Sequence, residues 1–284
     1  MHRICCKYNS FTNDLFECFN KRGYICAMPQ KTKFPISAII TTYNEADHIE
    51  QVLETLDWVD EVIVVDSYSD DETVELAQKK GAKVLIKQYH SPATQKNWAI
   101  PQANHEWVFI LDADERCTPE LEAEIKTILT KGTNKECFWI ARKNFFMGQH
   151  VKYSGWQGDK VIRLLRKHCR YEDKMVHEEI DVHGKQVGRL NNRLVHYTFK
   201  SYDHFLAKIN RYAAWSAQDY TTKTGKITLY HLWFKPLFRF FSHYFLQLGF
   251  LDGKTGFIIS RLMAWGVFLR YLKLMELRKI TKQH

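Results

Sequence analysis

The chain has 284 residues, of which 45% are hydrophobic and 14% aromatic, a composition that supports a packed core and excludes an intrinsically disordered protein. This length is sufficient for one large α/β domain, with or without an appendage. Lysine and arginine total 41 against 32 aspartate and glutamate, which gives a formal net charge of +9. Such an excess favours anionic partners: nucleic acid, anionic lipid or phosphorylated substrates.

The seven cysteines predict neither a disulfide framework nor a zinc site. Four of them lie in the first 26 residues, no C-x-x-C pair occurs, and no histidine cluster accompanies them. A reducing cytosol is therefore the expected compartment. Charged residues interrupt the first 30 residues, which argues against a secretory signal. No apolar run reaches the roughly 18–20 residues of a membrane-spanning helix.

Residues 1–34 show no regular hydrophobic period, and we predict an extension that precedes the folded domain. From Pro35 onward, strand-like apolar runs alternate with segments whose apolar residues have helical spacing. The predicted strands are residues 36–40, 61–65, 82–87 and 107–111, and the predicted helices are residues 46–56, 72–80 and 92–100.

After Thr130 this regular pattern loosens. Residues 137–142 and 160–166 are predicted strands, and the loop between them is rich in glycine and aromatic residues. Residues 170–200 suggest short strands with turns. From Ser201 onward the chain is predicted to be helical and is unusually aromatic.

Strands that alternate with helices over about 80 residues predict an α/β fold with a mostly parallel sheet and right-handed crossovers. In such a sheet, ligands bind at the carboxyl ends of the strands. The polar residues that follow the predicted strands all fall at such ends: Tyr43, Asn44 and Glu45 after the first, Asp66 after the second, and Asp112 and Asp114 after the fourth.

The stretch Leu111-Asp112-Ala113-Asp114-Glu115 places three acids at the end of a buried strand. On an extended backbone Asp112 and Asp114 point to the same side, and crowded carboxylates are costly unless a cation lies between them. Mg²⁺ or Mn²⁺ is the expected cation. The alternative is an acidic approach to a helix, since Thr118-Pro119-Glu120 is a favourable helix start.

Two nucleotide-binding motifs are absent. No G-x-G-x-x-G follows the first strand and no G-x-x-x-x-G-K-[ST] occurs, which argues against a dinucleotide oxidoreductase and a P-loop NTPase. A carboxylate at the end of the second strand, Asp66, is suited to hydrogen bonds with a ribose or base. The alternative role of Asp66 is helix capping, for which Ser69 and Asp70 are also available.

Four segments in this order resemble the family 2 glycosyltransferases of the GT-A (Rossmann-like) fold, and more narrowly the small bacterial branch that builds lipopolysaccharide core or other surface glycans. They are residues 41–45 (Thr-Thr-Tyr-Asn-Glu), 64–67 (Val-Val-Asp-Ser) with Asp70, 95–97 (Gln-Lys-Asn) and 111–115. The resemblance covers residues 35–280. It implies a catalytic domain at residues 35–200, with a nucleotide-sugar half (35–130) and an acceptor half (131–200), before a helical region at residues 201–284.

The resemblance also implies roles for individual residues. The first-strand loop (Thr42, Tyr43, Asn44 and Glu45) and Asp66 would hold the uracil and ribose of a nucleotide sugar, with a UDP-hexose as the expected donor. Asp112 and Asp114 would bind the diphosphate and its Mg²⁺ or Mn²⁺. Lys96 would lie near the pyrophosphate or base, with an exposed helical lysine as the alternative. Transfer is expected to invert the anomeric configuration.

The catalytic base is predicted in the acceptor half, because transfer requires a group that takes the proton of the attacking hydroxyl. Glu178, in Met175-Val176-His177-Glu178-Glu179, matches the acid of a similar element in related proteins, and Asp159 is the rival. His196 is a candidate third metal ligand, with a buried structural histidine as the alternative. Arg163 is predicted to bind the diphosphate or a phosphorylated acceptor, with a structural ion pair as its rival.

The last part of the chain interleaves aromatic and basic residues. Helices with apolar faces and basic flanks are typical of a membrane interface, and Arg261 interrupts the most apolar stretch. We therefore expect peripheral contact with anionic lipid at the inner face of the plasma membrane, where a glycan or lipid-linked acceptor is available. The alternative is packing against the catalytic domain or another subunit.

Two other functions compete. A metal-dependent nucleotidyltransferase also uses acids at strand ends, but it is expected to have a glycine-rich phosphate loop, and residues 41–45 contain no glycine. A nucleic-acid-binding protein would explain the basic tail, but not the acidic strand ends, and no nucleic-acid-binding motif is recognisable. We therefore expect no nucleic-acid partner.

Overall fold

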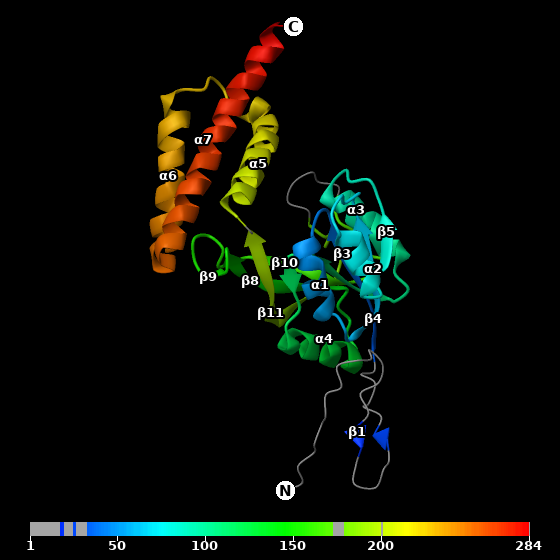
Figure 1. Ribbon diagram of the computed structural model, residues 1–284. Helices are drawn as coiled ribbons and strands as arrows, with labels where there is room; N and C mark the ends of the chain where they lie inside the picture. The colour runs from blue at the N-terminus through cyan, green and yellow to red at the C-terminus, as the bar shows by residue number, and fades with distance from the viewer. Residues whose placement is uncertain (1–17, 20–24, 27–32, 173–178, 200, 284) are drawn as a thin grey trace.

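The structure, a computed structural model, describes residues 18–19, 25–26, 33–172, 179–199 and 201–283. Strands and helices alternate through the first half of the chain (Figure 1). The elements of this half, after the short hairpin of β1 (Cys18–Phe19) and β2 (Ile25–Cys26), are β3 (Phe34–Thr42), α1 (Ala46–Glu54), β4 (Val59–Asp66), α2 (Thr73–Lys79), β5 (Lys83–Ile86), α3 (Pro92–Ala99), a short 3-10 turn (Ile100–Gln102), β6 (Trp107–Asp112), β7 (Glu115–Arg116) and α4 (Pro119–Lys131).

The second half contains long strands followed by helices. Its elements are β8 (Cys137–Phe146), β9 (Gln149–Val151), β10 (Lys160–Arg166), β11 (Val187–Phe199), α5 (Tyr202–Lys223), a π-helical turn (Tyr230–Phe234), α6 (Lys235–Phe241), a second π-helical turn (Ser242–Leu246), a 3-10 turn (Gly249–Asp252) and α7 (Gly253–Gln283). The prediction of short strands over residues 170–200 was wrong in part. An isolated bridge joins Tyr171 to Ile180, but β11 is a single 13-residue strand.

The main sheet has the strand order β5-β4-β3-β6-β10-β8-β11-β7, with β9 paired to β8. The first four strands are parallel, as expected for β-α-β units, and β10 joins them antiparallel to both β6 and β8. The pairing register places Thr42 beside Asp66 and Thr41 beside Asp112. The carboxyl ends of β3, β4 and β6 therefore meet at one edge of the sheet.

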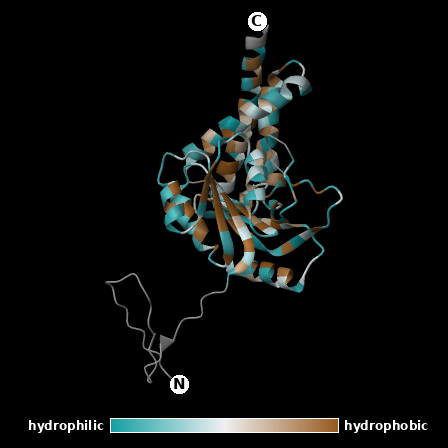
Figure 2. Ribbon diagram, turned by 90° about the vertical axis from the view of Figure 1, so that its right-hand side faces the viewer, coloured by the Kyte–Doolittle hydropathy of each residue, from teal (hydrophilic) through white to brown (hydrophobic). Residues whose placement is uncertain are grey.

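Alternate residues of the parallel strands feed two cores on opposite faces of the sheet. Ile36, Ala38 and Ile40 of β3 belong to the core shared with α1 and α4, whereas Ile39 belongs to the core shared with α3. All four are fully buried. Coverage on both faces explains why these strands are apolar without alternation, and Figure 2 shows them as a hydrophobic band inside the molecule. Each large buried side chain contributes roughly 1.5–3 kcal/mol.

Three C-terminal helices extend away from the sheet side by side, with α7 between α5 and α6 (Figure 1). Their base packs on the end of the sheet through an apolar cluster that includes Phe146, Phe199, Phe205 and Ile259. A polar tie lies beside this cluster. The Asp252 carboxylate accepts hydrogen bonds from the backbone N–H groups of residues 152 and 153, at 3.0 Å each, and from the Ser154 hydroxyl at 2.8 Å. Among the described residues, no helix is both long and apolar enough to cross a bilayer.

Candidate active site

A cavity of about 1030 Å³ opens where the carboxyl ends of β3, β4 and β6 meet. Seven of the predicted site residues line it: Thr42, Tyr43, Glu45, Lys96, Asp112, Asp159 and Arg163. Trp139, Tyr171 and Ile180 of the second half and several side chains of α5 complete the wall. The volume lies at the upper end of the range of small-molecule and cofactor sites.

The loop after β3 is held to the loop after β4. Asn44 has a positive φ of 54°, and its side chain donates to Asp70 at 2.7 Å while accepting from the Asp70 backbone N–H at 3.1 Å. Asp66 is fully buried and accepts hydrogen bonds from Thr42 at 2.9 Å and from the backbone and hydroxyl of Ser69. These contacts show that Asn44 and Asp66 organise the rim. Tyr43 and Tyr68 are 61% and 62% exposed there.

Asp112 lies at the cavity floor between two buried cations. Lys96 Nζ lies 3.0 Å from one carboxylate oxygen, and the guanidinium of Arg163 donates to the other. Burial alone would raise the pKa of the Asp112 carboxyl, but the charges of Arg163 and Lys96 outweigh it and hold this pKa well below its ordinary value. Lys96 is 1% exposed, so the alternative of an exposed helical lysine was wrong.

Glu115 is fully buried and binds residues that form the cavity floor. Its carboxylate accepts from Arg163 at 2.9 Å, from Arg142 at 3.2 Å and from the Asp112 backbone N–H at 3.1 Å. Burial lowers the pKa of Arg163, but Asp112 and Glu115 raise it more, so the guanidinium stays charged. Glu115 therefore fixes both arginines and the turn that carries Asp112.

Asp114 lies next to the cavity in a different environment. One of its oxygens, Oδ1, is buried without a hydrogen-bond partner, and Oδ2 lies 3.4 Å from His196 Nε2. The other ring nitrogen of His196 lies 2.7 Å from the amide oxygen of Asn144, an acceptor, so Nδ1 carries the proton. Nε2 and the Asp114 oxygen are then two acceptors that face each other, unless a proton or a metal ion lies between them.

This pair suits a divalent cation. Asp114 supplies an unpartnered buried oxygen, His196 supplies an imidazole nitrogen, and Asn144 orients the imidazole as a supporting partner does in metal sites. The Asn144 amide group in turn donates to Asp159 at 2.7 Å, which fixes the orientation of Asn144. The residues present therefore fit Mg²⁺ or Mn²⁺ at Asp114 and His196.

Of the two predicted catalytic bases, Glu178 and Asp159, the structure describes only Asp159. Glu178 and its neighbour His177 lie outside the described residues. Asp159 accepts two hydrogen bonds from Arg142, at 2.9 and 2.8 Å, in addition to the one from Asn144. Burial raises the pKa of Asp159, but the Arg142 contacts outweigh it and lower that pKa. A carboxylate held in this way is a weak proton acceptor.

One wall of the cavity comes from α5, which the sequence did not associate with the site. His204, Lys208, Arg211 and Trp215 line the cavity from this helix. Burial lowers the pKa of Lys208, and the carboxylates of Asp114 and Asp112 offset part of this effect. The sequence also did not identify Arg142 as a residue of the site. The helical spacing of the α5 side chains was visible in the sequence, but not the face that turns to the cavity.

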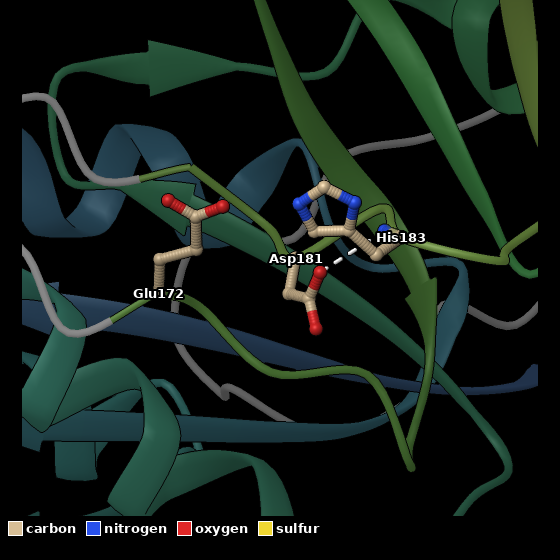
Figure 3. Close-up of side chains that lie close together, drawn as sticks. All are labelled: Glu172, Asp181 and His183. Atoms are coloured by element: carbon tan, nitrogen blue, oxygen red, sulfur yellow. Dashed lines mark hydrogen bonds between the residues drawn. The ribbon is translucent and has the colours of Figure 1, made fainter.

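A separate group, Glu172, Asp181 and His183, brings potential ligand atoms within 4.8 Å of one another (Figure 3). The Asp181 carboxylate accepts from the His183 backbone N–H at 3.0 Å and lies 3.7 Å from Lys185. These contacts within a turn explain the position of the Asp181 carboxylate, and we assign no metal to this group.

Comparison with known proteins gives the class. Residues 37–176 match the model of the family described as glycosyl transferase family 2. An uncharacterized glycosyltransferase of Rickettsia felis is 30% identical over 85% of this chain and 89% of its own length. The lipopolysaccharide core biosynthesis glycosyltransferase LpsC of Rhizobium meliloti is 26% identical over 84% of this chain and 94% of its own.

Among solved structures, glucosyl-3-phosphoglycerate synthase of Mycobacterium tuberculosis, in complex with Mn²⁺, UDP and glucosyl-3-phosphoglycerate, is 24% identical with a TM-score of 0.33. That match covers 40% of this chain and 44% of the other. The sequence relatives define a glycosyltransferase, and the chain belongs to glycosyltransferase family 2. Its architecture is the α/β fold with a mostly parallel first half of the sheet and a helical C-terminal region that the sequence predicted.

Proposed function

We propose that this glycosyltransferase is inverting and metal-dependent, and that it moves a hexose from a UDP-sugar to a hydroxyl of a glycan or lipid-linked acceptor in cell-envelope polysaccharide or lipopolysaccharide synthesis. The observation that carries the proposal is the Asp114 carboxylate beside a cavity at the strand ends. One of its oxygens is buried without a hydrogen-bond partner, and the other lies 3.4 Å from His196 Nε2. The similarity to LpsC supports the envelope-glycan part of the proposal.

The nucleoside is assigned to the loops after β3 and β4. Thr42, Tyr43 and Glu45 line that side of the cavity, while Asn44 and Asp66 hold the loops together. A carboxylate offers about four acceptor positions, and Asp66 uses three for Thr42 and Ser69, so one remains for the ribose or base. Lys96 and Arg163 counter the charge of Asp112, and we assign them to the diphosphate because both also line the cavity.

Asp114 and His196 are the proposed metal ligands, with Asp112 beside them. A divalent ion bound there would act as a Lewis acid for the charge that develops on the departing UDP. The protein itself excludes water from the floor, because Lys96, Glu115 and Arg163 are nearly or fully buried. Glu178 is the proposed base that takes the proton of the acceptor hydroxyl, and the engaged hydrogen bonds of Asp159 favour this choice.

The test of the proposed function is a thermal-shift screen of nucleotide sugars with and without Mn²⁺. A ligand that binds only the native state raises the melting temperature with its concentration. We expect stabilisation by UDP and by one UDP-hexose, and only in the presence of metal. Equal stabilisation by ATP or CTP and none by UDP-sugars would instead favour a nucleotidyltransferase.

We also propose that the helical region holds the protein peripherally at an anionic membrane, with the catalytic domain in the cytoplasm. Residues 220–284 contain eleven lysines and arginines and two acids, whereas residues 1–219 contain thirty of each. The last 65 residues therefore carry the entire net charge of +9. This separation of charge supports attraction to anionic lipid rather than a uniformly basic surface.

The exposed side chains of α6 and its flanking turns support the same proposal. Trp233, Phe234, Leu237 and Phe238 are between 63% and 71% exposed and share one helix face. Lys235 turns the other way and donates to the Tyr271 hydroxyl of α7 at 2.8 Å. The outer face of α6 is thus apolar, and an apolar face of this extent favours contact with lipid or protein.

A further inference from the structure

The side of α5 that faces the cavity carries two cations, Lys208 and Arg211, between a histidine and a tryptophan. His204, Lys208, Arg211 and Trp215 are spaced by four, three and four residues, so they form one face of the helix. All four line the cavity. The helix follows β11, whereas the proposed nucleoside loops follow β3 and β4, on the other side of β6, β10 and β8 in the sheet order. The wall that contains Arg211 therefore comes from a part of the fold that three strands separate from the proposed nucleoside loops.

The charges on this face differ from those on the floor. Lys96, Arg163 and Arg142 are each paired with a carboxylate. Within the described part of the chain, neither Lys208 nor Arg211 forms an ion pair with an acid. Arg211 lies over the ring of Trp215, with its guanidinium carbon 5.5 Å from the ring centroid. Lys208 is half-buried, so its attraction for an anion is less screened by solvent, whereas Arg211 is exposed at the cavity wall and offers its guanidinium for paired hydrogen bonds.

We propose that Lys208 and Arg211 form a subsite for the anionic group of the acceptor, a phosphate or a carboxylate on a sugar, with Trp215 packing against the sugar. This inference rests on the proposed function, since it assigns the acceptor class of the same cavity. Guanidinium groups match the paired oxygens of phosphate and carboxylate, and an aromatic ring beside them provides an apolar surface for a sugar ring.

The competing assignment is the donor diphosphate. Lys208 is close enough to Asp112 and Asp114 to interact with them, so it can face both substrates. Arg211 lies one helix turn farther along the same face, which makes it the discriminating residue. If it serves the acceptor, its removal changes acceptor affinity and leaves UDP affinity unaltered.

The test measures the binding of three small probes, glucose 6-phosphate, glucuronate and glucose, to protein saturated with UDP and Mg²⁺, by ligand-observed NMR titration. Mg²⁺ is used because it is diamagnetic. We expect at least one anionic probe to bind about tenfold more tightly than glucose, as one charge-assisted hydrogen bond would provide. The anionic probe that binds distinguishes a phosphorylated acceptor from a carboxylated one. Arg211→Ala should remove this preference and change UDP affinity by less than about twofold, and Lys223→Ala, outside the cavity on the same helix, should retain it.

Three results would overturn the inference. The first is that the unaltered protein binds glucose and both anionic probes equally. The second is that Arg211→Ala keeps the preference for the anionic probe, and the third is that UDP affinity falls about tenfold or more in Arg211→Ala. Failure of the unaltered protein to bind UDP at all would count against the proposed function alone. The three probes are then titrated without nucleotide, and the same comparison between Arg211→Ala and Lys223→Ala decides the inference.

Discussion

At the scale of single residues, the two aspartates of the Asp112-Ala113-Asp114 segment have different surroundings. Asp112 is neutralised by Lys96 and Arg163, whereas one oxygen of Asp114 is buried without a partner. The sequence predicted that both acids lie at a strand end, because that follows from the β-α-β pattern. The family resemblance favoured Asp114 as the direct metal ligand, with Asp112 nearer the ribose or bridged by water. The sequence did not predict that Lys96 and Arg163 neutralise Asp112, because these cations come from α3 and β10, far apart along the chain.

Glu115 illustrates the same limit. From the sequence, two roles were open for Glu115: support of the metal site, or the approach to a helix. The structure places it in β7, where it pairs with Arg142 and Arg163. These partners belong to β8 and β10, and no local pattern of residues indicates a contact between strands that are brought together only by the sheet order.

The assignment of the base gives the first residue-scale prediction. Glu178→Gln should abolish sugar transfer and leave UDP binding nearly normal, because the proton acceptor is lost without a change in the donor contacts. Asp159→Asn should weaken transfer and metal-dependent UDP binding together, since Asp159 orients Asn144 and through it His196. Steady-state kinetics with UDP titrations of both variants provide the measurement. Loss of transfer with normal UDP binding in Asp159→Asn would move the base to Asp159.

At the scale of elements, the parallel half of the sheet was predictable because local periodicity and strand order coincide there. The second half was not, because β10 inserts between β6 and β8 and the 13 residues of β11 cross much of the domain. The role of α5 was missed for a related reason. Its cavity face is set by packing on β11 and α7, which the helical spacing alone does not specify.

The junction between the 3-10 turn at residues 249–252 and α7 gives an element-scale prediction. A methyl group on Gly256 would lie 1.9 Å from the Gly249 carbonyl oxygen, so the two segments must separate if it is present. Gly256→Ala should lower the free energy of unfolding by about 1–3 kcal/mol or more, as expected for overpacking. Gly225→Ala is the control, because nothing lies within 4 Å of its added methyl group. Equal denaturant midpoints for the two variants would contradict this packing.

At the scale of the whole molecule, charge and exposed aromatic surface coincide. The helical region carries the full net charge, and its outer helix presents apolar side chains to solvent. The sequence predicted from composition that this region is basic and aromatic, which is typical of a membrane interface. It did not show that the α6 aromatic face is exposed in the chain, because packing against the catalytic domain or another subunit was the alternative. In the structure the three helices extend away from the sheet (Figure 1).

This arrangement predicts salt-sensitive binding to vesicles that contain phosphatidylglycerol, and weak binding to pure phosphatidylcholine vesicles, in a sedimentation assay. Replacing Trp233 and Phe238 together by alanine should weaken binding at least about tenfold, because two large side chains lose their lipid contact. Ile86→Ala, which changes a 46% exposed residue at the edge of the sheet, is the control. Preferential binding to single-stranded RNA over anionic vesicles would contradict the membrane assignment.

The central claim is that Asp114 and His196 hold the metal on which binding of the nucleotide sugar depends. The most direct test is calorimetric titration of UDP, once with Mn²⁺ and once with EDTA. It is done on the unaltered protein, on Asp114→Asn and on the control Asp219→Asn. Asp219 is a suitable control because its side chain is exposed on α5. We predict tight UDP binding that requires Mn²⁺ in the unaltered protein and the control, and an affinity at least about tenfold lower in Asp114→Asn with no response to metal. UDP binding that is equally tight in EDTA, or unchanged in Asp114→Asn, would contradict the account.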